Sequence, residues 1–442
     1  MRTITIMGGT VVTASSQTRA DLRIEQGKIA AIGEVEPGDE IVDAGGLLVM
    51  PGMVDTHVHL MDPGASERED FVTGTSAAAA RGVTTIVEHT HAHPIRTVTE
   101  LVEKRQHLVG RANVDYGLAA HVWPDRIGEI PDLAREGIVF FKIFTCNTHG
   151  VPGLEADRLA SALGVLGETG ARCLIHNEDE TMTHYAELRL RADGRVDPGL
   201  LLEWRSRDAE LVAVAATAAA LVGTRAVATF AHVSHPGVLD IIDEFRRLGA
   251  DIAAEACPQY FAMDEAEVTE AGALRKFTPP ARIRDAGDRS AMWRAVEEGR
   301  FSHFSTDHAP STLAQKQTPD FWEAPFGLPG LDTTLPFLID AALSGRITMS
   351  DVVRLYTTAP ANRYRLRKGV IEIGADADLV LVDPEGSWKV RNEDVISKAG
   401  WSPFAGKTFR GRVMTVYLRG EEIARDGRCH DLRTGRWIGA TI

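Results

Sequence analysis

Six side chains that could hold metal ions or move protons lie within or directly after short apolar runs of the sequence. They are His57, His59, Lys142, His176, His232 and Asp307. Apolar runs of this kind are expected to form buried strands, where an ionisable group is costly unless it is paired or bound to a metal. Imidazole and carboxylate are common ligands of divalent transition metals. Together the six residues predict a metal site.

The closest pair in the sequence is His57 and His59, separated by one valine. Side chains alternate along a strand, so both imidazoles point to the same side and can supply two nitrogens to one ion without bending the chain. For His176 or His232 taken alone, a hydrogen-bonded core histidine is the simpler interpretation. Their placement at comparable positions of different runs favours the metal site.

Lys142 lies in the run GIVFFKIF, among aromatic and branched apolar residues. Burial disfavours the ammonium form and lowers the pKa of a lysine. The resulting neutral amine can react with CO2 to form a carbamate, an anion with two oxygens that can hold two cations. A lysine that extends its charged end to solvent is the alternative.

Asp307 ends the segment FSHFSTDH. One of its oxygens could bind a metal, and the other could accept a proton from water, as a general base does. An N-cap for a following helix is the alternative. We interpret His89, His121, His303 and His308 as supporting or core residues rather than metal ligands.

The elements that must position these residues are eight apolar runs alternating with longer segments typical of helices. Eight strand–helix units fit a closed parallel α/β barrel, whose active site lies at the carboxyl ends of the strands. A doubly wound open sheet is the competing arrangement, but its GxGxxG and GxxxxGK[ST] phosphate-binding motifs are absent from the sequence. The runs are MVDTHVH (53–59), TTIVEHT (84–90), VDYGLAAHV (114–122), GIVFFKIF (137–144), RCLIHNE (172–178), AVATFAHV (226–233), DIAAEACP (251–258) and FSHFSTDH (301–308).

Both ends of the chain differ from this middle part. Residues 1–50 and 366–442 contain short alternating segments between glycine-rich turns, such as TITIMGGTVVT and GRVMTVYLRGEEIARDGR. This pattern predicts strands. We therefore expect a small β-sandwich domain built from 1–50 and 366–442, and a barrel domain over 51–365.

The composition is that of a soluble globular protein rather than a nucleic-acid-binding or membrane protein. The 442 residues are 44% hydrophobic and 25% charged, and carry a net charge of −14 that disfavours binding to phosphates or anionic lipids. The four cysteines form no CxxC pair, and the sequence contains no secretory signal and no apolar run of membrane-spanning length. We expect a cytoplasmic protein that acts on a small molecule.

The motifs, in this combination and order, resemble the amidohydrolase superfamily, specifically its cyclic amidohydrolases: hydantoinases, dihydropyrimidinases, allantoinases and dihydroorotases. The resemblance implies a (β/α)8 barrel with a β-sandwich domain assembled from both termini. The matching segments are PGMVDTHVH, FVTGTSAAAARGVTTIVE, FFKIF, LIHNED, FAHVSH, EACPQYF, FTPPAR, STDHAP, APFGLPGLDTTLP, APANRYRL and GADADLVLVD.

The resemblance also implies two zinc ions and the residues that hold them. One ion would be bound by His57, His59 and Asp307, the other by His176 and His232, with N6-carboxylated Lys142 bridging the two. A hydroxide shared by the metals would open the amide bond of a small ring, and Asp307 would pass the proton to the leaving nitrogen. From the resemblance and the acidic composition we expect this chain to form a homodimer or homotetramer, with helices outside the barrel making the contacts.

The sequence departs from the family motifs where the substrate would bind. Dihydroorotase-like sequences carry an arginine that grips the substrate carboxylate, and this chain has Met61 there. An asparagine of the same enzymes is replaced by His91, and the tyrosine of hydantoinases by Asn147, whose amide could still donate. We expect His91, Asn147 and Thr278 to contact the substrate, and neutral ureide or imide rings to be preferred.

Three other functions remain open at this point. A dihydroorotase-like hydrolase would need another cation for the carboxylate, such as Arg68 or Arg96. A non-catalytic relative that uses the barrel for assembly would lack ligands, but the chain keeps all six. A mononuclear deaminase would not need Lys142.

Overall fold

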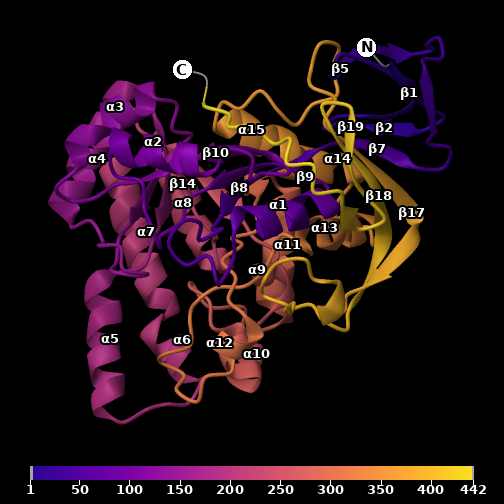
Figure 1. The fold of residues 1–442 in the computed structure, drawn as a ribbon. Coiled ribbons are helices and arrows are strands. Elements are labelled where there is room, and N and C mark those ends of the chain that lie inside the picture. Colours follow the sequence, from indigo (N-terminus) through magenta and orange to yellow (C-terminus); the bar gives the residue numbers. More distant parts are fainter. Residues whose placement is uncertain (1–2, 441–442) are drawn as a thin grey trace.

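A parallel barrel forms the centre of the computed structural model, which describes residues 3–440 (Figure 1). It has eight strands, because β10 and β11 are two parts of one strand interrupted at Ala119. The ring closes where Val58 pairs with His308 and the His59 amide donates to the His308 carbonyl at 2.7 Å. The barrel strands are β8 (Met53–Val58), β9 (Val83–Glu88), β10 (Asp115–Leu118), β11 (Ala120–His121), β12 (Phe141–Phe144), β13 (Arg172–His176), β14 (Val227–Phe230), β15 (Asp251–Ala256) and β16 (His303–Phe304).

Helices surround the barrel, and α5, α6, α10 and α12 gather at its lower end in Figure 1. No helix within residues 3–440 combines the length and the apolar character needed to cross a membrane. The helices are α1 (Phe71–Ala80), α2 (Val98–His107), α3 (Ile130–Arg135), α4 (Ala156–Thr169), α5 (Glu180–Ala192), α6 (Leu200–Trp204), α7 (Arg207–Leu221), α8 (Pro236–Arg247), α9 (Gln259–Ala262), α10 (Glu265–Ala271), α11 (Ala286–Glu297), α12 (Leu313–Lys316), α13 (Thr334–Leu343), α14 (Met349–Val353) and α15 (Ala359–Arg363), with short 3₁₀ turns at Ile127–Glu129, Gly272–Arg275 and Asn392–Asp394 and a π-helical turn at Arg354–Thr358.

The outer helices follow ordinary rules of capping and amphipathicity. In α8, Pro236 occupies the first turn, where its missing N–H is not needed, and Val238, Leu239 and Ile242 are buried on one face. Helix α2 begins with a capping box between Thr97 and Glu100. Local sequence therefore fixes where these helices start, and burial of one face holds them against the strands.

Strands from both ends of the chain form two further sheets beside the barrel. One sheet has the order β5-β4-β1-β6 and the other β20-β19-β18-β17-β7-β2-β3, in which β7 pairs with β17. Apolar residues from both segments, including Leu22, Val49 and Leu379, share one core cluster. The strands are β1 (Ile4–Met7), β2 (Thr10–Val12), β3 (Gln17–Arg19), β4 (Asp21–Glu25), β5 (Lys28–Gly33), β6 (Glu40–Asp43), β7 (Leu48–Pro51), β17 (Leu379–Lys389), β18 (Thr408–Leu418), β19 (Glu421–Arg425) and β20 (Arg428–Cys429).

The domain limits at residues 50, 51, 365 and 366 stay predictions, and residues 1–2 and 441–442 of the predicted terminal segments lie outside the described residues. The strands are shorter than the apolar runs. Their carboxyl ends stop before His59, His232 and Asp307, which lie on the turns that follow. Lys142 differs, because it is the second residue of β12 and lies inside the strand.

Candidate metal centre

The first half of the site lies where β8 meets the turn after β16. The Nε2 atoms of His57 and His59 lie 3.1 and 3.5 Å from the same carboxylate oxygen, Oδ1 of Asp307. Lys142 reaches the group from β12, with its Nζ 3.4 Å from Nε2 of His57. Three strands far apart in the sequence thus bring four polar side chains to one point inside the barrel end.

The second half is a pair of histidines from neighbouring strands. Nδ1 of His176, at the end of β13, lies 3.0 Å from Nε2 of His232, just after β14. The rings of His57 and His232 are 5.5 Å apart, so the two halves form one continuous cluster. His232 and Asp307 have positive φ angles of 37° and 50°. Such angles are rare in residues other than glycine and concentrate at functional sites.

Burial sets the protonation states in this cluster. It lowers the pKa of His59 and His232 well below the ordinary value, and that of His176 to about 4. These imidazoles are therefore neutral at pH 7 and keep a lone pair for a cation. Burial also lowers the pKa of Lys142 to about 8 and raises that of Asp307 to about 6. A substantial fraction of Lys142 is thus in the neutral amine form near physiological pH.

Partners behind the histidines fix which ring nitrogen faces the cluster. Nδ1 of His57 donates to Oε1 of Glu255 at 2.7 Å, and Nδ1 of His59 donates to the His89 carbonyl at 3.0 Å. Both Nε2 atoms are left to face Asp307, an arrangement typical of metal-binding histidines. Our sequence analysis missed Glu255, although a carboxylate inside the apolar run DIAAEACP is the same signal that singled out Lys142.

His176 is held by a second buried carboxylate that the sequence analysis also missed. Nε2 of His176 donates to Glu178 at 2.9 Å, and Thr278, Arg205 and Arg282 donate to the same carboxylate at 2.8, 2.9 and 2.6 Å. Burial alone would raise the pKa of Glu178, but the Arg205 guanidinium and the His176 hydrogen bond hold it well below the ordinary value. The Thr278 hydroxyl, expected to contact substrate, is thus directed at Glu178.

The Asn147 side chain is engaged by neighbouring protein groups, and its contact with the substrate stays a prediction. Its side chain is exposed, its amide nitrogen donates to Glu180 at 2.6 Å, and its oxygen accepts from the Gly153 amide at 2.9 Å. The bond to Gly153 lies within the loop, and the bond to Glu180 joins the loop to the start of α5. The spacing of residues in the sequence does not predict the contact between Asn147 and Glu180, because Glu180 belongs to a different strand–helix unit.

His91 does lie beside the cluster. Its ring centroid lies 5.1 Å from that of His59. The ring also stacks on that of His149, with 4.3 Å between the two centroids. Within the described part of the chain, neither ring nitrogen of His91 has a hydrogen-bond partner, and the same holds for His89 and His121. Burial lowers the pKa of all these rings well below the ordinary value. His91 therefore offers one donor and one acceptor to a ligand.

One arginine approaches this region from a loop. Arg68 donates to the carbonyls of Pro310 and Phe326 at 3.1 and 3.2 Å, and within residues 3–440 it has no carboxylate partner inside 4.0 Å. Burial lowers its pKa to about 10, and its charge contributes to the lowered pKa of His91. Met61 is fully buried, and Arg96 is engaged by Glu100.

Comparison with known proteins identifies the family. Residues 48–423 match the model of the amidohydrolase family. The chain is 34% identical to an allantoinase of Rubrobacter xylanophilus, covering 98% of this chain and 96% of the relative, and 31% identical to a dihydroorotase of Clostridium acetobutylicum, covering 92% and 95%. The crystal structure of dihydropyrimidinase from Brevibacillus agri superposes with a TM-score of 0.92 at 28% identity, covering 100% of this chain and 99% of that structure. The barrel and the sequence motifs have the same explanation: this chain belongs to the amidohydrolase family and, within it, to the cyclic amidohydrolases.

Proposed function

We propose that this cyclic amidohydrolase holds two divalent metal ions, zinc by preference, in the cluster just described. His57, His59 and Asp307 would hold one ion, His176 and His232 the other, and a carboxylated Lys142 would join them. The observation that carries the proposal is the set of neutral, buried nitrogens and one carboxylate that point at one another over 3.0 to 3.5 Å. Nitrogen and oxygen donors of this kind suit zinc.

The bound ions would activate water and polarise the amide carbonyl of the substrate. The protein residues then orient the ring and move the proton. Asp307, with its pKa raised to about 6 by burial, is a carboxylate that can accept a proton at neutral pH and return it to the leaving nitrogen. His91 can hydrogen bond to the ring from the side of β9. The product would be an open-chain carbamoyl or amide acid.

For the substrate we propose a small neutral ureide or imide, of the hydantoin, dihydropyrimidine or allantoin kind. The support is the replacement of a fixed arginine by Met61, which is buried and apolar, together with neutral His91. A substrate carboxylate placed against these groups would lose its hydration without gaining a partner, which is costly. The names of two relatives, an allantoinase and a dihydropyrimidinase, refer to rings of the proposed class.

Dihydroorotate is the second candidate, and a specific observation favours it. Arg68 is a half-buried guanidinium that hydrogen bonds only to carbonyls in the described structure, and its charge lowers the pKa of His59, His91 and His149. An anionic ring would give it the carboxylate that it lacks. The dihydroorotase relative is consistent with this alternative.

Kinetics on a panel of rings separates the two candidates. We expect kcat/KM for hydantoin, dihydrouracil or allantoin to exceed that for dihydroorotate, and Arg68→Met to change the preferred reaction little. If Arg68 grips a carboxylate instead, Arg68→Met should lower kcat/KM for dihydroorotate alone by about 10- to 150-fold. Arg96→Met is the matched control. A wild-type preference for dihydroorotate would contradict the neutral-ring proposal.

We further propose a homodimer or homotetramer in which helices outside the barrel make the contacts. Tyr185 and Leu188, one turn apart on α5, are 71% and 55% exposed. Apolar side chains clustered on a helix surface are typical of protein interfaces. Light scattering at micromolar concentration should give the mass of two or four chains. The Tyr185→Asp variant should give a lower mass. A monomer over that range would refute the proposal.

A further inference from the structure

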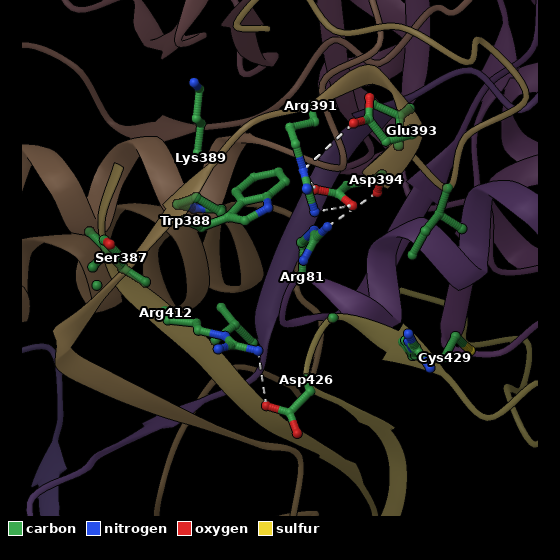
Figure 2. A pocket seen from close by; sticks show the side chains of 18 of the residues that line it. Arg81, Ser387, Trp388, Lys389, Arg391, Glu393, Asp394, Arg412, Asp426 and Cys429 are labelled. Carbon is green, nitrogen blue, oxygen red and sulfur yellow. Dashed lines mark hydrogen bonds and ion pairs between the residues drawn. The ribbon is translucent and has the colours of Figure 1, made fainter. Parts of the chain in front are cut away.

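A pocket of about 860 Å³ lies between the carboxyl end of α1 and strands β17 and β18 (Figure 2). Basic side chains outnumber acidic ones in its lining. The basic residues are Arg81, Lys389, Arg391, Arg412 and Arg428, and the acidic residues are Glu393, Asp394 and Asp426.

Arg81 is the buried cation of this pocket. The residue is only 8% exposed, and its guanidinium carbon lies 4.1 Å from the centre of the Trp388 ring. Nη2 donates to the Asp394 carbonyl at 3.3 Å, whereas Nε has no hydrogen-bond partner. Within residues 3–440 no carboxylate lies inside 4.0 Å of this guanidinium, although Asp332 and Asp394 attract it from farther away. A buried arginine with an unused donor is costly unless an anion binds it.

The backbone closes tightly on the same arginine. Gly427 has a φ of +75°, and a Cβ added there would lie 2.5 Å from Nη1 of Arg81. Any larger residue would displace the guanidinium, so glycine permits this close approach. Together with Trp388 on its face, this contact holds the Arg81 side chain in one orientation.

The other cations lie at the exposed side of the pocket. Arg391 pairs with Asp394 at 2.8 Å and Arg412 with Asp426 at 3.2 Å, and such exposed pairs contribute little to stability. Lys389 and Arg428 form no ion pair within the described residues. The lining therefore keeps a surplus of positive charge although the whole chain carries −14.

We propose that this pocket binds a small phosphate-bearing anion. Arginine presents a planar fork of donors that matches the oxygens of phosphate, and a fixed Arg81 with Arg412 and Arg428 in the same lining offers several such donors. Lys389 adds positive charge, but its side chain points away from Arg81 (Figure 2). The volume of about 860 Å³ exceeds that of a single phosphate group, so a pyrophosphate or a phosphorylated metabolite fits. The site serves recognition rather than hydrolysis.

The pocket is separate from the metal centre. Arg81 precedes β9, whereas His89 and His91 follow it. A strand of six residues spans roughly 20 Å, so a ligand on Arg81 cannot touch the reacting ring. The proposal therefore does not depend on the metal ions or on the substrate.

Calorimetric titration of the full-length protein with inorganic pyrophosphate at low salt tests the proposal. We expect one saturable site per chain, and Arg412→Ala and Arg428→Ala should each weaken binding by about 10-fold. Arg81→Met should abolish binding, with circular dichroism as the check on folding. Arg158→Ala, an exposed arginine on α4, is the matched control and should bind as the wild type.

Two further samples distinguish the sources of a signal. Asp307→Asn should retain binding, because the pocket lies far from the metal centre, and citrate should bind more weakly than pyrophosphate if phosphate is the recognised group. Absence of saturable binding would overturn the proposal. Binding that is lost in Asp307→Asn but kept in Arg412→Ala would also overturn it, because the anion would then occupy the metal centre.

Discussion

Replacing Lys142 with alanine is expected to abolish ring opening, lowering kcat/KM by about 10³-fold or more. The side chain is buried, its Nζ lies 3.4 Å from Nε2 of His57, and burial lowers its pKa to about 8. These features suit a neutral amine that forms a carbamate between two cations. Without it both proposed ions would lose a shared anionic ligand. Initial rates on a saturating cyclic ureide, with metal content measured on the same sample, check this result.

The control for this variant is Lys407→Ala, which changes an exposed lysine. A short carboxylic acid with bicarbonate should restore part of the activity to Lys142→Ala, because it can occupy the position of the carbamate. Wild-type activity in Lys142→Ala would exclude the bridging role. It would favour an interpretation in which the lysine only fills space at the barrel end.

Asp307→Asn is expected to lower kcat by about 10²- to 10⁴-fold while KM changes little. Asparagine keeps the shape and one oxygen near His57 and His59, but it cannot accept the proton that Asp307 would pass to the leaving nitrogen. Steady-state kinetics on the preferred ring measures the effect. Asp332→Asn, which alters another buried aspartate outside the cluster, is the comparison for changes in folding. An unchanged kcat would show that another group carries the proton.

The fold was predictable from the sequence because each barrel strand lies in a short apolar run, and five of the eight runs carry at least one of the six predicted site residues in their second half. The family, the barrel and the cyclic-amide class are confirmed by the comparisons. His57, His59, His176 and His232 meet because parallel strands place their carboxyl ends at one edge. Their roles as ligands stay predictions.

The features of the site that the sequence did not predict depend on contacts between strand–helix units that are distant in the sequence. Glu180, in the following strand–helix unit, accepts a hydrogen bond from the Asn147 side chain, and Glu178 accepts one from the Thr278 hydroxyl. Neither contact follows from periodicity or spacing, because both depend on how the loops above the strands pack. Arg68 illustrates the same limit. Because Arg68 lies in a loop, the sequence does not predict where its side chain points. The structure places its charge near His91.

The metal content of the active enzyme is the most direct test of the binuclear site. Protein purified without chelator should contain about two divalent ions per chain, as expected if the five convergent side chains and Lys142 serve as the proposed ligands. Chelation should remove both activity and metal, and zinc should restore both. Full activity in a sample that carries one ion per chain would contradict the account.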